Sequence, residues 1–168
     1  LTMITSIRPP APPSTKSDQF KRETDEVLYY SKNATREEIG IVHFWADGAN
    51  TYTPPGHWNA IAADDFIQQN FSEVRWARNM ALLNITLMDA AIACWDAKYF
   101  YFNPRPSQVN SAIKTWTGLP NFPSYTSGHS TFSGAAATIL GYIVPAKKQS
   151  YEAMAKEASL SRLYGAIH

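Results

Sequence analysis

The sequence is poor in several features that would point to particular protein classes. Its 168 residues include one cysteine, Cys94, which excludes an internal disulfide framework and reads as a buried, inert thiol. No cysteine or histidine grouping has zinc-site spacing, and no glycine-rich loop indicates nucleotide binding. No secretory signal is recognisable, and the most apolar long segment, residues 74–97, is interrupted by arginine, asparagine and aspartate. We therefore predict no membrane span.

Acidic residues are absent between Ala97 and Tyr151, although the formal net charge of the whole chain is only +1. A segment that holds lysine and arginine without competing carboxylates creates a local positive field, which favours a small, highly charged anion. A nucleic-acid surface would need more basic residues, spread along one face, so we expect no nucleic-acid partner.

Alternating strand patterns are also missing, and the apolar fraction of 45% is typical of a globular protein. We predict a single all-α domain over residues 1–168, with an extended proline-rich segment at 1–17 and a loop at 51–57. The expected helices cover residues 19–31, 35–45, 58–69, 72–97, 108–117, 127–144 and 149–164.

Some helix faces can be assigned from the sequence. Thr35 to Glu38, "TREE", is a capping box, and the helix that it opens should bury Phe44 and a hydrogen-bonded core His43. The helix at 72–97 is apolar on most sides, which predicts a central place in the core.

Three clusters hold residue types that carry chemistry. The first has Lys98 followed by Arg105-Pro106, the second is the triplet Ser127-Gly128-His129, and the third has Ser161-Arg162 followed by His168. Because Arg162 and His168 are six residues apart, a break near Gly165 is needed for both to face one site.

These clusters suit a tetrahedral oxyanion such as phosphate or vanadate. Arginine offers forked donors, lysine adds a compact charge, and a helix N-terminus supplies free N–H groups. Ser127 adds a hydroxyl, and Gly128 lets the backbone come close. His129 could exchange a proton with the bound anion, and a neutral His168 could act as nucleophile or ligand.

The order of the three clusters resembles the signature shared by type 2 phosphatidic acid phosphatases (PAP2) and vanadium-dependent haloperoxidases. The stretch "FPSYTSGHSTFSGAAA" at 122–137 is most similar to the soluble haloperoxidase branch. So are "RPPAPP" near the start, "FWAD" at 44–47 and "PPGHWN" at 54–59. The resemblance implies a helical bundle like the core of that superfamily.

The resemblance also implies a role for each site residue. His168 would ligate vanadium axially in a haloperoxidase, or become the phosphohistidine in a phosphatase, and His129 would be the acid–base partner. The residues expected to hold the vanadate or phosphate are Lys98, Arg105, Ser127, Gly128 and Arg162.

The leading hypothesis is a vanadate-dependent enzyme that oxidises halide with hydrogen peroxide. The alternatives are a PAP2-type acid phosphatase acting on phosphomonoesters, and a non-catalytic truncated helical domain. The family signature continues with an aspartate three residues after the final histidine, so we expect a fragment truncated at both ends that lacks the C-terminal part of the domain. The resemblance allows an exported or periplasmic location and leaves the oligomeric state open.

Three further polar residues have simple interpretations. His57, after Pro-Pro-Gly, either lines the entrance to the pocket or packs a loop. Asp64 and Asp65 are expected on a solvated helix face.

Overall fold

The computed structural model describes residues 3–168, and every regular element within them is helical. The all-α fold predicted from the sequence is therefore confirmed. The elements in chain order are η1 (Ile4–Ser6), α1 (Asp18–Asn33), α2 (Arg36–Phe44), α3 (Thr53–Ile67), α4 (Glu73–Tyr101), α5 (Pro106–Val109), α6 (Gly128–Ile143), η2 (Pro145–Lys147) and α7 (Lys148–Tyr164).

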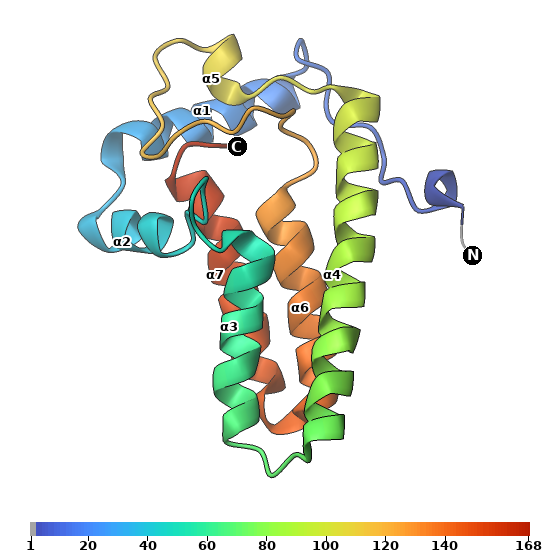
Figure 1. Cartoon of the computed structure of the whole chain (residues 1–168). Coiled ribbons are helices and arrows are strands. Elements are labelled where there is room, and N and C mark those ends of the chain that lie inside the picture. The colour runs from blue at the N-terminus through green and yellow to red at the C-terminus, as the bar shows by residue number, and fades with distance from the viewer. Residues whose placement is uncertain (1–2) are drawn as a thin grey trace.

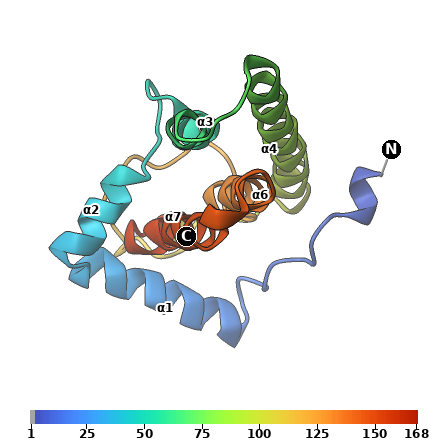
Figure 2. The ribbon, with the colours of Figure 1, turned by 90° about the horizontal axis from the view of Figure 1, so that it is seen from below.

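Four long helices form a bundle, which Figure 1 shows from the side and Figure 2 end-on. α6 and α7 form a hairpin with the most extensive packing, α4 and α3 pack against α6, and α2 and α1 flank α7. Small residues such as Ala136 and Ala137 let α6 sit at the centre of this arrangement, because they permit close helix contacts.

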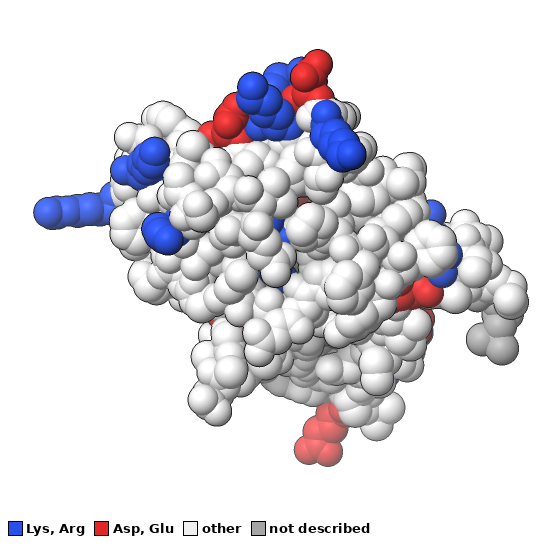
Figure 3. Space-filling view, turned by 90° about the horizontal axis from the view of Figure 1, so that it is seen from above, with Lys and Arg blue, Asp and Glu red and all other residues white. Residues whose placement is uncertain are grey.

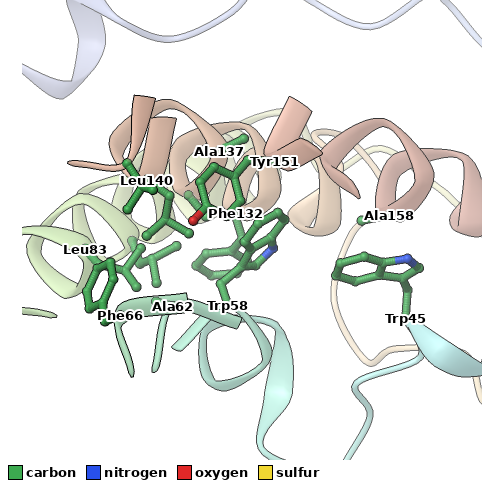
Figure 4. Packing of buried hydrophobic residues seen from close by; sticks show 13 residues of the cluster. Trp45, Trp58, Ala62, Phe66, Leu83, Phe132, Ala137, Leu140, Tyr151 and Ala158 are labelled. Atoms are coloured by element: carbon green, nitrogen blue, oxygen red, sulfur yellow. The ribbon is translucent and has the colours of Figure 1, made fainter. Parts of the chain in front are cut away.

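Large apolar side chains from all four bundle helices fill the core (Figure 4). Each contributes about 1.5–3 kcal/mol when fully buried. Trp58 also donates from its indole to Ser133 Oγ at 3.0 Å, which ties α3 to α6. The main core residues are Trp45, Trp58, Phe66, Leu83, Phe132, Leu140 and Tyr151.

Side chains cap the N-termini of α2 and α6. Thr35 and Glu38 form the predicted capping box at the start of α2. Ser127 caps α6 by accepting the Ser130 N–H at 3.2 Å. This cap fixes the direction in which the first turn of α6 points.

Two boundary predictions are wrong. The helix expected at 108–117 is only the single turn Pro106–Val109, because the following chain is held by contacts such as Trp116 N–H to Gly165 O at 3.1 Å. The loop expected at 51–57 instead begins α3 at Thr53, since Pro54 and Pro55 fit the first turn of a helix.

α2 buries a narrower face than predicted. Val42 and Trp45 are fully buried, whereas Phe44 is 58% exposed and His43 is also exposed. The prediction of a core His43 is therefore wrong, because α2 contacts the bundle mainly along α7 and leaves its outer side in solvent.

α4 has one buried and one open face, contrary to the prediction that most of its sides are buried. Leu83, Leu87 and Cys94 face the core, while the opposite side carries exposed apolar residues such as Met88 and Ile92. Within the described residues, Glu73–Val109 is the one segment that is long and apolar enough to cross a membrane. The expected absence of a membrane span thus stays a prediction.

The proline-rich segment lies against the end of α4. Arg8 pairs with Asp96 at 2.7 Å, and Tyr101 Oη donates to Pro9 O at 2.6 Å. Apart from η1, the described part of residues 1–17 has no regular structure before α1; its first two residues lie outside the described range.

Candidate anion-binding site

The three sequence clusters meet at one end of the bundle, the upper end in Figure 1. Lys98 lies in the last turn of α4, Arg105 caps the short α5, and Ser127 caps α6. Arg162 lies in the last turn of α7, and His168 follows that helix. Chain segments distant in sequence are thus brought to one place.

His168 reaches this place because the chain turns sharply after α7. The helix ends at Tyr164, close to the break expected at Gly165, and Ala166 adopts a left-handed φ of 55°. A Cβ at Gly165 would lie 3.0 Å from Ser161 O and 3.2 Å from Val42 Cγ1, so a larger residue would force this turn apart.

The imidazole of His168 connects two of the clusters. Its Nε2 lies 2.9 Å from Ser127 Oγ, and its Nδ1 lies 3.3 Å from Arg105 Nη1. Because a guanidinium can only donate, Nδ1 accepts the hydrogen bond from Arg105 in this arrangement.

Three cations are buried around His168 without a carboxylate partner. Lys98 is 0%, Arg105 2% and Arg162 4% exposed. Lys98 Nζ donates to the carbonyls of Pro123 and Ser124 at 2.8 and 2.9 Å. In the described part of the chain, no Asp or Glu lies within ion-pair distance of any of the three.

Arg105 and Arg162 have N–H donors that no described residue accepts. Arg105 Nη2 donates to Phe122 O at 2.9 Å, but its buried Nε finds no acceptor among residues 3–168. Arg162 donates from Nε to Ser161 Oγ and from Nη2 to Val42 O. A buried donor without an acceptor costs free energy, so its presence fits a site that receives an anion.

Solvent reaches basic groups from this end of the molecule. In the view from above, Figure 3 shows blue basic atoms at the bottom of a narrow opening surrounded by uncharged residues. A separate groove of about 290 Å³, lined partly by Pro12, Phe20 and Tyr125, also reaches Ser127 and His168.

Burial weakens the hold of these groups on their protons. Desolvation lowers the pKa of Lys98 to about 8 and those of Arg105 and Arg162 to about 10, so all three stay largely cationic at neutral pH. Burial, reinforced by these cations, also lowers the pKa of His168 well below its usual value, which leaves the imidazole neutral.

His129 is neutral for the same reason. Burial, and then the charge of Arg162, lowers its pKa to about 4. Its Nε2 lies 2.6 Å from the carbonyl oxygen of Trp45 and must donate to it, so Nδ1 carries the free lone pair. His129 can therefore accept a proton at Nδ1.

Gly128 is not required by crowding within the chain. A Cβ there would make ordinary contacts of 3.7–3.8 Å with the Trp95 ring. Its value for a site lies in its N–H, since the first N–H groups of a helix have no intrahelical acceptor.

Asp47 and His57 also belong to this region, although no cluster pattern singled them out. His57 Nδ1 lies 3.1 Å from both carboxylate oxygens of Asp47, and both side chains are about 5% exposed or less. Asp47 acts electrostatically on Arg162, and burial raises its own pKa. The sequence signals were the stretches "FWAD" and "PPGHWN", which bring the two residues within ten positions.

The chemistry of these residues suits an oxyanion better than a bare cation. No group of three or more His, Cys, Asp or Glu side chains that could hold a metal ion occurs between residues 3 and 168. A tetrahedral oxyanion needs donors and positive charge, which the site provides.

Residues 78–168, which contain all three clusters, match the family profile of the PAP2 superfamily. The chain belongs to this superfamily.

Two relatives narrow the class further. A bacterial vanadium-dependent iodoperoxidase of known crystal structure superposes with a TM-score of 0.81 and 31% sequence identity, over 96% of this chain and 47% of that one. The vanadium chloroperoxidase of Curvularia inaequalis is 28% identical over 55% of this chain and 20% of its own length. Within the PAP2 superfamily, these similarities support the vanadium haloperoxidase family. The chain spans about half the length of the first relative and a fifth of the second.

Proposed function

We propose that the chain provides the oxyanion site of a vanadate-dependent haloperoxidase, which oxidises halide ions with hydrogen peroxide. The observation that carries this proposal is the set of three buried cations around His168, none of them paired with a carboxylate. The similarity to an iodoperoxidase and a chloroperoxidase favours halide oxidation over other chemistry of such a site.

The residues present fit vanadate, because Arg105 Nε is a buried donor without an acceptor in the described chain and the local positive charge is unbalanced. Lys98, Arg105 and Arg162 would neutralise the anion, while Ser127 and the Gly128 N–H would donate to it. Bound vanadate would supply a Lewis-acidic centre that activates peroxide without a change in oxidation state.

His168 would hold vanadium through Nε2, which requires a lone pair there and a proton on Nδ1. Arg105 now donates to Nδ1, so Nε2 carries the proton in the neutral ring. We expect an arriving anion to draw the Arg105 N–H away from Nδ1, which lets the imidazole change tautomer.

His129 would act as the acid–base group. Its free Nδ1 can take a proton from hydrogen peroxide, because the ring is neutral at pH 7. A bound anion would offset the charge of Arg162 and raise the pKa of His129, which makes it a better base at that moment.

The second candidate is a PAP2-type phosphomonoesterase, favoured by the match of residues 78–168 to the superfamily as a whole. In that reaction His168 Nε2 would bond to phosphorus as the bond to the ester oxygen breaks. His129 would first have to gain a proton at Nδ1, once the bound phosphate has raised its pKa, and would then give it to the departing oxygen. Water would then release phosphate from His168.

One pair of assays separates the candidates. Purified protein reconstituted with vanadate should oxidise bromide in the presence of hydrogen peroxide, with phosphate as an inhibitor. Turnover of a phosphomonoester, inhibited by vanadate, would favour the phosphatase instead. Failure of both would support the non-catalytic alternative.

A further inference from the structure

His57 has surroundings that packing alone does not explain. Its ring stacks on Trp45 at 4.5 Å, with Phe44 and Tyr52 edge-on at 4.9 and 5.2 Å. A phenylalanine would suit this aromatic box, yet the position holds an imidazole whose Nδ1 lies on the carboxylate of Asp47. The contact between His57 Nδ1 and Asp47 therefore indicates a role other than filling space.

The carboxylate of Asp47 is placed between two basic partners. Asp47 follows α2 in a left-handed conformation, with φ of 45°, and its side chain is 4% exposed. His57 contacts both of its oxygens at 3.1 Å, whereas Arg162 interacts with it only at longer range. The other titratable groups facing this pair are His129 on α6 and Tyr52, whose ring packs against His57.

The guanidinium of Arg162 uses only some of its donors within the described residues. Its Nε and Nη2 donate to Ser161 Oγ and Val42 O, and Nη1 makes no hydrogen bond to the described residues. If Asp47 moved onto Arg162, it would form a buried ion pair and compete with an anion for the same donors.

We propose that His57 is a positioning residue, which holds the carboxylate of Asp47 away from Arg162 and so keeps that guanidinium available to a bound oxyanion. This inference rests on the proposed oxyanion site, and it concerns this chain's own residues rather than the chemistry of the bound group.

The test is calorimetric titration of the 168-residue chain with inorganic phosphate at pH 7, with thermal unfolding to confirm that each variant is folded. His57→Phe fills the box without a donor and should weaken phosphate binding at least about fivefold. His57→Asn restores a donor near Nδ1 and should bind within about twofold of the parent.

The double variant His57→Phe/Asp47→Asn removes the competing charge as well. It should recover phosphate affinity to within about twofold of Asp47→Asn alone. The matched control is His43→Phe, the same change at an exposed position on α2, which should bind like the parent.

Three other results would contradict the inference. If His57 only fills space, Phe will be tolerated and Asn will not, which reverses the expected order and overturns the inference. A double variant as weak as His57→Phe overturns it too. A parent chain that does not bind phosphate would instead refute the proposed oxyanion site, and this inference with it.

Discussion

At the end of the bundle where α6 turns into α7, Asp65 accepts a hydrogen bond from Tyr151 Oη at 2.6 Å and pairs with Lys147. At the opposite end of α6, Lys98 and Arg105 are buried among carbonyl oxygens with no carboxylate in ion-pair distance. One end satisfies its own polar groups, whereas the other keeps donors and positive charge in excess. That excess supports the proposal that this end binds an anion, because a chain gains no stability from unpaired buried cations.

The largest expected effect is at His168. His168→Ala should abolish vanadate binding, since it removes the one side chain proposed to bond to vanadium. Phosphate, which needs only the cations and N–H donors, should still bind within about tenfold of the parent. Calorimetric titration with each anion checks this, with His43→Ala as control. Retained stoichiometric vanadate binding would show that His168 is not the residue that holds vanadium.

Arg105→Ala should cause the second-largest loss, which is a loss of catalytic activity. Removing one preorganised donor to a developing charge typically costs about 3–4 kcal/mol, so either activity should fall by a factor on the order of several hundred. Arg75→Ala, an exposed arginine at the opposite end of α4, is the matched control. Activity within tenfold of the parent would contradict the role given to Arg105.

The positive charge can also be removed by pH. The free-state pKa of Lys98 is about 8 and a bound anion raises it, so phosphate affinity should fall as pH rises above about 8. The limiting loss is about tenfold per pH unit, measured by titration between pH 7 and 9.5. Lys98→Arg should flatten the dependence, because arginine stays charged over this range. Affinity unchanged across the range would argue against contact with Lys98.

The smallest effect on the site is predicted for Asp65, at the end of the bundle where α6 turns into α7. Asp65→Asn weakens the bonds to Tyr151 and Lys147 and should lower the free energy of unfolding by about 1–2 kcal/mol, followed by urea denaturation. Phosphate affinity should not change. A loss of affinity at this distance would mean that the two ends are coupled rather than independent.

The sequence predicted the cation-rich end of the bundle but not the contacts at the Asp65 end. The spacing of Lys98, Arg105 and Arg162 and the turn residues before α6 pointed to a common anion site, and the structure brings these residues together. The partners of Asp65 were not foreseen: its expected solvated face is wrong, because Lys147 and Tyr151 come from the distant α6–α7 turn. Such pairs depend on tertiary packing, which local patterns do not encode.

The Asp47–His57 contact could not be predicted from the sequence either, because it also depends on the three-dimensional structure. It depends on the left-handed backbone at Asp47 and on α3 beginning at Thr53, whereas the sequence predicted a loop there. The open face of α4 was equally unpredictable, since an apolar helix reads the same whether one side or all sides are covered.

The claim that the upper end of the bundle is a built oxyanion site is tested most directly by a crystal structure of the protein grown with vanadate. We predict tetrahedral anion density within hydrogen-bond distance of Arg105 and Ser127, with His168 Nε2 turned toward it. Density elsewhere on the molecule, or none at saturating vanadate, would contradict this account.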